Sequence, residues 1–268
     1  MLEAVAGFLG TAVGLVLGLT GAGGAVLSVP LLTLLLGLPM VDAAPIALLA
    51  VTISAGLGAL LALRRGILRY KAAFLMALAG ALASPLGIAA AHRAPNRPLQ
   101  ILFAAILIWI GARAWIDARR KPEDLAAERA LRPPPCRLDR SIGKLHWTWP
   151  CARRLAGAGL VAGFLSGLLG VGGGFVLIPA LRKHTDLEPN AIVATSMGVL
   201  TLISGLGAAV SMAHAPLNLP VALPFIGGAA LGMLAGRHLA NWISGSSLQK
   251  AFGSLAFTVA FFMALGAT

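Results

Sequence analysis

The chain is poor in charge for its length. Only 11% of its 268 residues are charged, whereas ordinary soluble domains carry roughly 25%. Its two cysteines and five histidines are too few and too scattered to indicate a clustered metal site. Long apolar runs without any charge are present instead, including 72–91 and 190–213. Because a membrane-spanning helix needs about 20 mostly apolar residues, the sequence predicts an all-α polytopic membrane protein.

Signatures of enzymes and of nucleic-acid binding are also missing. The sequence contains neither the H-E-x-x-H of metalloproteases nor the G-x-S-x-G of serine hydrolases, so we expect no enzyme, no metal and no cofactor. The net charge is +12, but half of the charged side chains lie between Asp117 and Arg154. The others mostly flank apolar runs, without the interleaved aromatic residues of a base-stacking surface. Basic segments beside membrane helices are typical of the cytoplasmic side. We therefore expect this protein to lie in a lipid bilayer and not to bind nucleic acid.

A glycine-rich motif occurs twice. The stretch GLTGAGGAVLSVP begins at Gly18, and GLLGVGGGFVLIP begins 149 residues later at Gly167. The same offset relates other glycine pairs and indicates a duplicated unit. Further along, Gly87 aligns best with Gly232, which requires a gap of four residues. The sequence thus predicts two homologous halves.

The two halves are predicted to be joined by a charged linker. We place the first transmembrane repeat at 1–114, the linker at 115–152 and the second repeat at 153–268. The linker contains three consecutive prolines and both cysteines, Cys136 and Cys151. With the linker on the cytoplasmic side, we expect these cysteines to be free thiols.

Each half opens with a glycine-interrupted apolar element, followed by three plain spans. If that element is a broken helix that crosses once, the halves are parallel and 15 of the 21 Lys and Arg residues lie inside. If it is a re-entrant hairpin, the halves are inverted and 19 of the 21 lie inside, with only Arg93 and Arg97 outside. The positive-inside rule favours inverted-topology repeats with both termini outside.

The glycines suggest an anion site. Non-helical backbone survives inside a bilayer only where it is buried in protein or lines a wet cavity. A helix that restarts after such a break presents free N–H groups and a positive dipole end, which favour an anion. We expect both restarts to point at one shared spot near the middle of the membrane, with hydroxyls from the following spans nearby. The candidate substrate-binding residues are Thr20, Gly21, Gly23, Gly24, Thr52, Gly170, Gly172, Gly173, Thr195, Ser196 and Thr201, and Ser54 and Ser204 lie near the threonines.

The motifs resemble those of the sulfite exporter family, also called TauE/SafE or the toluene sulfonate uptake permeases. The resemblance rests on GLTGAGGAVLSVPLL, GLLGVGGGFVLIPAL and the stretch NAIVATSMGVL from Asn190 to Leu200. It implies a transporter in the bacterial inner membrane that exports sulfite or an organosulfonate such as sulfoacetate by alternating access. The alternatives are an uncoupled anion channel and a carrier of another small anion with the same fold. A coupling proton or ion and the oligomeric state are not specified by the sequence.

Overall fold

The structure is a computed structural model of the chain. It describes residues 2–21, 23–119, 135–136, 138–139, 144–145, 148–213, 217–240 and 245–267. Most of the predicted linker at 115–152 lies outside the described residues. The division of the chain at 114 and 153 stays a prediction.

Helices account for almost all of the described chain. The first half forms α1 (Leu2–Thr20), α2 (Gly23–Leu36), α3 (Met40–Arg64), α4 (Tyr70–Arg93) and α5 (Asn96–Arg119). The second half forms α7 (Trp149–Leu169), α8 (Gly174–His184), α9 (Pro189–Met212), α10 (Leu219–Leu239) and α11 (Gly245–Ala267). Between the halves, strands β1 (Leu138–Asp139) and β2 (Lys144–Leu145) pair antiparallel.

Seven helices of the described chain are long and apolar enough to cross a membrane, namely α1, α3, α4, α5, α7, α9 and α10. Shorter apolar helices are α2 and the part of α11 from Gln249 to Leu265. The prediction of an all-α polytopic membrane protein is therefore confirmed.

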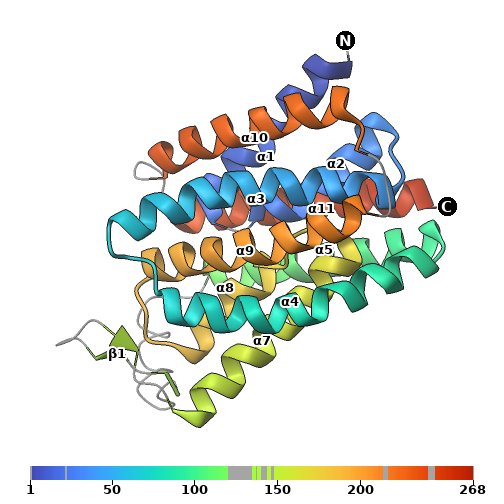
Figure 1. Cartoon of the computed structure of the whole chain (residues 1–268). Coiled ribbons are helices and arrows are strands. Elements are labelled where there is room, and N and C mark those ends of the chain that lie inside the picture. The colour runs from blue at the N-terminus through green and yellow to red at the C-terminus, as the bar shows by residue number, and fades with distance from the viewer. Residues whose placement is uncertain are drawn as a thin grey trace.

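Helices α3 and α9 form the centre of the bundle. In the most apolar 18-residue stretch of α9, 72% is buried inside the protein, which is the largest share among the candidate spans. Figure 1 shows the pair α1 and α10 on one side of this centre and the pair α4 and α7 on the other. Each of these outer pairs joins one helix of the first half to one helix of the second. The halves are therefore interlocked and do not pack as two separate bundles.

The two outer pairs use the same glycine contacts. A Cβ on Gly10 of α1 would clash with the carbonyl of Phe225 in α10, and a Cβ on Gly159 of α7 would clash with the carbonyl of Met76 in α4. Both members of the second contact are related to the first by 149 positions. Close backbone approach at small residues is how membrane helices pack tightly.

One predicted alignment is wrong. Gly87 packs on the backbone of Phe164, and Gly236 packs on the backbone of Leu15. Because Phe164 and Leu15 are also 149 positions apart, the counterpart of Gly87 is Gly236 and not Gly232. The offset therefore continues through α4 and α10 without the expected gap.

Corresponding helices of the two halves run in opposite directions at the centre. Thr52 of α3 lies against Gly205 of α9, while Gly56 lies against Thr201, so α3 and α9 cross antiparallel. Helix α2 turns back onto α1, since Gly24 packs against the backbone of Val13 and Leu17. Figure 1 shows both termini at the right-hand end of the bundle and β1 of the linker at the left-hand end.

The prediction of free cysteines is wrong. Cys136 and Cys151 form a disulfide, with 5.1 Å between their Cα atoms. Cys151 lies in the first turn of α7, and the backbone N–H of Cys136 donates to His184 O at the end of α8 (3.1 Å). The disulfide ties Cys136 of the linker to α7, and the hydrogen bond ties it to α8. Sequence spacing alone did not reveal this proximity.

Candidate functional site

The two glycine motifs form turns between consecutive helices. We call the described residues Thr20, Gly21, Gly23 and Gly24 the first glycine turn and residues 170–173 the second glycine turn. Helix α1 ends at Gly21 (φ +80°), whose N–H donates to Leu17 O at 2.7 Å, and α7 ends at Gly170 (φ +71°), whose N–H donates to Ser166 O at 2.8 Å. A left-handed residue after the last helical residue is a common way to end a helix, and only glycine adopts it without strain.

The restarts of α2 and α8 lie deeper in the bundle than the ends of α1 and α7. Gly24 packs on the backbone of Val13 in the middle of α1, and Gly173 packs on the backbone of Ala162 in the middle of α7. One spot shared by both restarts stays a prediction.

Gly21 lies against Val193, one turn into α9, and Gly170 lies against Ala44, one turn into α3. Because α3 and α9 are antiparallel, the turns approach this central pair from opposite ends. Helix α1 has 19 residues, about 28 Å at 1.5 Å per residue, and after Gly21 the chain folds back so that Gly24 lies beside Val13.

The helices that restart after the turns differ in how they are capped. The Oγ1 of Thr20 accepts a hydrogen bond from Gly23 N at 2.8 Å and donates to Val16 O at 2.7 Å. Thr20 therefore caps the N-terminus of α2, as threonine commonly does. Helix α8 begins after Gly173 (φ +69°), and no side chain of the described residues caps its N-terminus. Its free N–H groups are thus not satisfied in the way those of α2 are.

The second turn is closed over by side chains of α3 and α9. A Cβ on Gly172 (φ +73°) would lie 2.6 Å from Ser204 Oγ, 3.0 Å from Leu200 and 3.2 Å from Val51. The first turn is closed as well, because a Cβ on Gly23 would lie 2.7 Å from the Phe252 ring. Both turns are therefore packed tightly against side chains of neighbouring helices.

The predicted hydroxyls are only partly gathered around the turns. Thr52 and Thr201 lie at the crossing of α3 and α9, and each donates to its own helix, to Leu48 O at 2.7 Å and Met197 O at 2.8 Å. Such back-bonding is usual for threonine in membrane helices.

Thr195 and Ser196 serve other contacts. Thr195 Oγ1 accepts from the backbone N–H of Arg69 in the connection between α3 and α4 (3.2 Å), away from both turns. Ser196 Oγ donates to Val193 O at 2.8 Å, one helical turn from the contact with Gly21. Thr195 is thus not brought to the candidate site.

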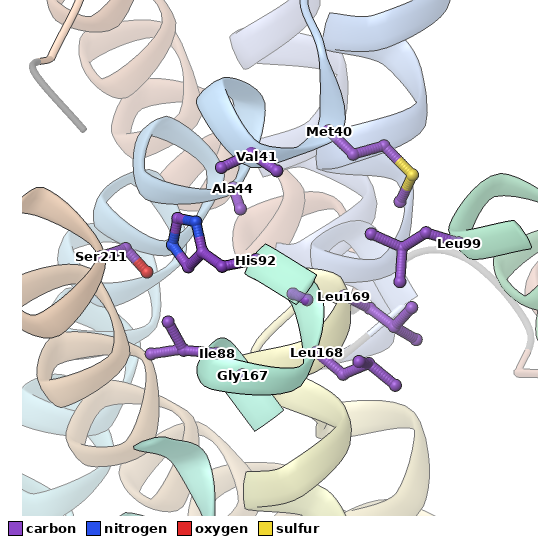
Figure 2. Close-up of a pocket in the computed structure, with 11 residues that line it drawn as sticks. Met40, Val41, Ala44, Ile88, His92, Leu99, Gly167, Leu168, Leu169 and Ser211 are labelled. Carbon is purple, nitrogen blue, oxygen red and sulfur yellow. The ribbon is translucent and has the colours of Figure 1, made fainter. Parts of the chain in front are cut away.

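A small pocket of about 20 Å³ adjoins the second turn (Figure 2). Its lining comes from the start of α3, the end of α4, the start of α5, the last turn of α7 and the end of α9, and includes Ala44, His92, Leu169 and Ser211. In Figure 2 the His92 ring and the Ser211 hydroxyl lie on the same side of this pocket. Because one water needs roughly 10–15 Å³ by this measure, the pocket is too small for an oxyanion in this conformation.

A cationic side chain bridges α10 and α3 on the other side of the bundle. Arg237 Nη1 donates to Gly58 O at 2.9 Å. Gly58 has no room for a side chain, because Met233 and Met197 fill the space where its Cβ would be. Arg237 therefore joins the helices of two different halves near the first turn, where Gly18 packs on the backbone of α10.

Several buried hydroxyls were not assigned to a site from the sequence. Four serine Oγ atoms are buried with no hydrogen-bond partner in the described part of the protein, and all four residues are fully buried: Ser54, Ser84, Ser166 and Ser204. Their one signal in the sequence is a hydroxyl inside an otherwise apolar run. Ser54 and Ser204 were noted only as neighbours of the candidate threonines, and none of the four has a hydroxyl counterpart 149 positions away.

Comparison with known proteins agrees with the architecture. The family model described as "Sulfite exporter TauE/SafE" matches residues 6–263. A "Probable membrane transporter protein" of Xylella fastidiosa strain Temecula1 is 26% identical over 95% of this chain and 92% of its own length. The "Probable membrane transporter protein YunE" of Bacillus subtilis strain 168 is 28% identical over 84% of this chain and 83% of its own. No solved structure matches the chain significantly. With its membrane-spanning helices and these relatives, the chain belongs to the sulfite exporter TauE/SafE family, as a multi-pass bacterial membrane transporter and not an enzyme.

Proposed function

We propose that this protein exports a small sulfur-containing anion, sulfite or an organosulfonate such as sulfoacetate, by alternating access. The observation that carries the proposal is that α2 and α8 both begin inside the bundle, at buried glycine turns, where backbone N–H groups can replace the hydration shell of an anion. The nature of the cargo rests on the family to which the chain belongs.

We further propose that the two halves are inverted-topology repeats. The support is the antiparallel crossing of α3 and α9, and the position of the two termini at one end of the bundle with β1 at the other (Figure 1). Inverted repeats have two equivalent conformations in which the site opens to opposite sides of the membrane, which is the basis of alternating access. Reporter fusions at both termini and in the linker test this arrangement. A linker on the same side of the membrane as the termini would refute it, because parallel halves of four spans each predict that result.

In this mechanism each turn is one gate of a central pathway. The first glycine turn closes against Val193 and Phe252, and the second closes against Val51 and Ser204. Because the turns approach α3 and α9 from opposite ends, loosening one of them opens the pathway to one side only. The anion that passes would then contact the glycine backbone exposed at the open turn and the hydroxyls at the crossing of α3 and α9.

The experiment is transport in proteoliposomes. Vesicles that contain the purified protein and are loaded with sulfite or sulfoacetate should release the anion at a rate that saturates with its concentration, as expected of a carrier. Gly172→Leu places a side chain against Ser204 and should abolish this release, as should Gly23→Leu. Gly227→Leu is the matched control, because nothing lies within 4 Å of a Cβ at Gly227.

Each outcome has a distinct meaning. Full transport in both Gly23→Leu and Gly172→Leu would remove the turns from the mechanism. A release that rises linearly with concentration, without saturation, would indicate an anion channel with the same fold. No release of either anion by the wild-type protein would refute the proposed cargo.

A further inference from the structure

We propose that the second glycine turn alone holds the anion, through the hydroxyls of Ser166 and Ser204 and the uncapped N-terminus of α8. The inference rests on the proposed function, and it assigns the binding role to one of two turns that look alike in sequence. It also makes Thr20 a structural residue.

The hydroxyls of Ser166 and Ser204 are unusual within this protein. Other buried hydroxyls in the helices, such as Ser28, donate to a carbonyl one turn earlier in their own helix. Ser166 and Ser204 are also fully buried, yet no described residue accepts from or donates to them. A buried hydroxyl without a partner is unfavourable unless it serves a purpose such as ligand binding.

Buried serine hydroxyls gather near the second glycine turn. Ser204 Oγ lies against Gly172, at 2.6 Å from the position of its absent Cβ, and Ser166 is one helical turn before Gly170. Ser84 Oγ lies 3.5 Å from the Cβ position of Gly207, which is one turn along α9 from Ser204. Helices α4, α7 and α9 thus each bring one such hydroxyl to the same region.

The first glycine turn lacks this polar environment. The three serines near the second turn each have an apolar residue 149 positions away, so the equivalent surroundings of the first turn are hydrophobic. The counterparts of Ser166, Ser204 and Ser84 are Leu17, Ala55 and Met233. The backbone donors there are also reduced, because Thr20 already accepts from Gly23 N–H.

The start of α8 indicates the sign of the charge on the ligand. The N-terminus of α8 carries the positive end of the helix dipole and has no side-chain cap. Serine hydroxyls and backbone N–H groups can all donate to one acceptor. This set therefore fits a small oxyanion with several acceptor oxygens, and it disfavours a cation.

The anion reaches this site from the end of the bundle that carries both termini. The small pocket of Figure 2 is lined by Gly167 and Leu169, next to Ser166 in α7, and by Ala44, which contacts Gly170. Movement of the α7–α8 turn away from α3 would widen this pocket toward Ser166. The site is thus closed here and opens at its own turn.

The test is anion binding by the full-length protein in nanodiscs, with sulfite and sulfoacetate as probes. Ser204→Ala and Ser166→Ala should each raise the Kd about tenfold, as expected for the loss of one hydrogen bond to a charged group. Ser28→Ala, a buried serine that bonds its own helix, is the matched control and should stay within twofold of wild type. Thr20→Ser, which keeps the cap, should also bind like wild type.

A second readout separates binding from folding. Without ligand, Ser204→Ala should melt no lower than wild type, because the substitution removes no hydrogen bond of the protein. Unchanged Kd values in both serine variants would overturn the inference while leaving the proposed function intact, provided that the wild type transports. Stabilisation that follows Na⁺ instead of the anion would indicate a cation site and also overturn it. A wild type that neither binds nor transports either anion would refute the inference and the proposed function together.

Discussion

Replacing Gly163 by alanine tests the close packing between α4 and α7. A Cβ at this position would overlap the carbonyl oxygen of Gly80 and lie 2.5 Å from its carbonyl carbon. The helices would have to separate by about 1 Å to restore van der Waals contact, and overpacking of this kind costs about 1–3 kcal/mol. The separation would also loosen the neighbouring contacts of Gly159 and Gly167 with α4.

The same helix provides a control of opposite sign. Gly157 lies in α7, and nothing lies within 4 Å of its Cβ position. Gly157→Ala should therefore raise stability by about 0.5–1 kcal/mol through helix propensity alone. Gly14→Ala, the counterpart of Gly163→Ala, overlaps the carbonyl of Ala229 in α10 and should lower stability by a similar amount.

The assay is thermal unfolding of the purified protein in one detergent, followed by tryptophan fluorescence. For a chain of this size, 1 kcal/mol corresponds to roughly 2–4 °C in Tm, so Gly163→Ala should melt on the order of 5 °C lower and Gly157→Ala about 2 °C higher. A Gly163→Ala protein with the Tm of Gly157→Ala would refute the reasoning, because the two helices could not then be as close as the structure places them.

Two further changes test individual contacts. Thr20→Val removes the cap of α2 and should lower stability by about 1–2 kcal/mol without changing the Kd for sulfite; a weaker Kd at unchanged Tm would instead make Thr20 a ligand-binding residue. Arg237→Met removes the hydrogen bond to Gly58 O and should lower stability by about 1–2 kcal/mol, measured as Tm, whereas a Tm equal to wild type would show that the bond contributes nothing.

The helices could be predicted from the sequence because the length of an apolar run sets the span. The charge-free run 72–91 lies within α4, and 190–213 covers α9 almost completely. The correspondence of Gly87 could not be settled in this way. Both Gly232 and Gly236 occur on one face of α10, and only the contact of Gly236 with α1 across the halves identifies the counterpart.

The candidate site was predicted less well, for physical reasons that the residues themselves show. Thr20 precedes Gly23 at capping distance, so its structural use could have been recognised from capping preferences. Ser84 and Ser166 were not predicted, because a serine in an apolar helix looks the same in sequence whether its hydroxyl bonds to its own helix or faces a site. The disulfide between Cys136 and Cys151 depends on where the linker meets the end of α8, which no local pattern encodes.

The exchange of partners between the halves has a consequence for biosynthesis. A growing chain delivers its N-terminal segments to the membrane first, yet α1 packs mainly on α10, which begins only at Leu219. Until the ribosome has completed α10, the glycine face of α1 around Gly10 and Gly14 must remain in lipid without its helical neighbour. A nascent or truncated chain that stops before α10 therefore carries an unfilled glycine groove, which membrane quality control can recognise as an unfinished product.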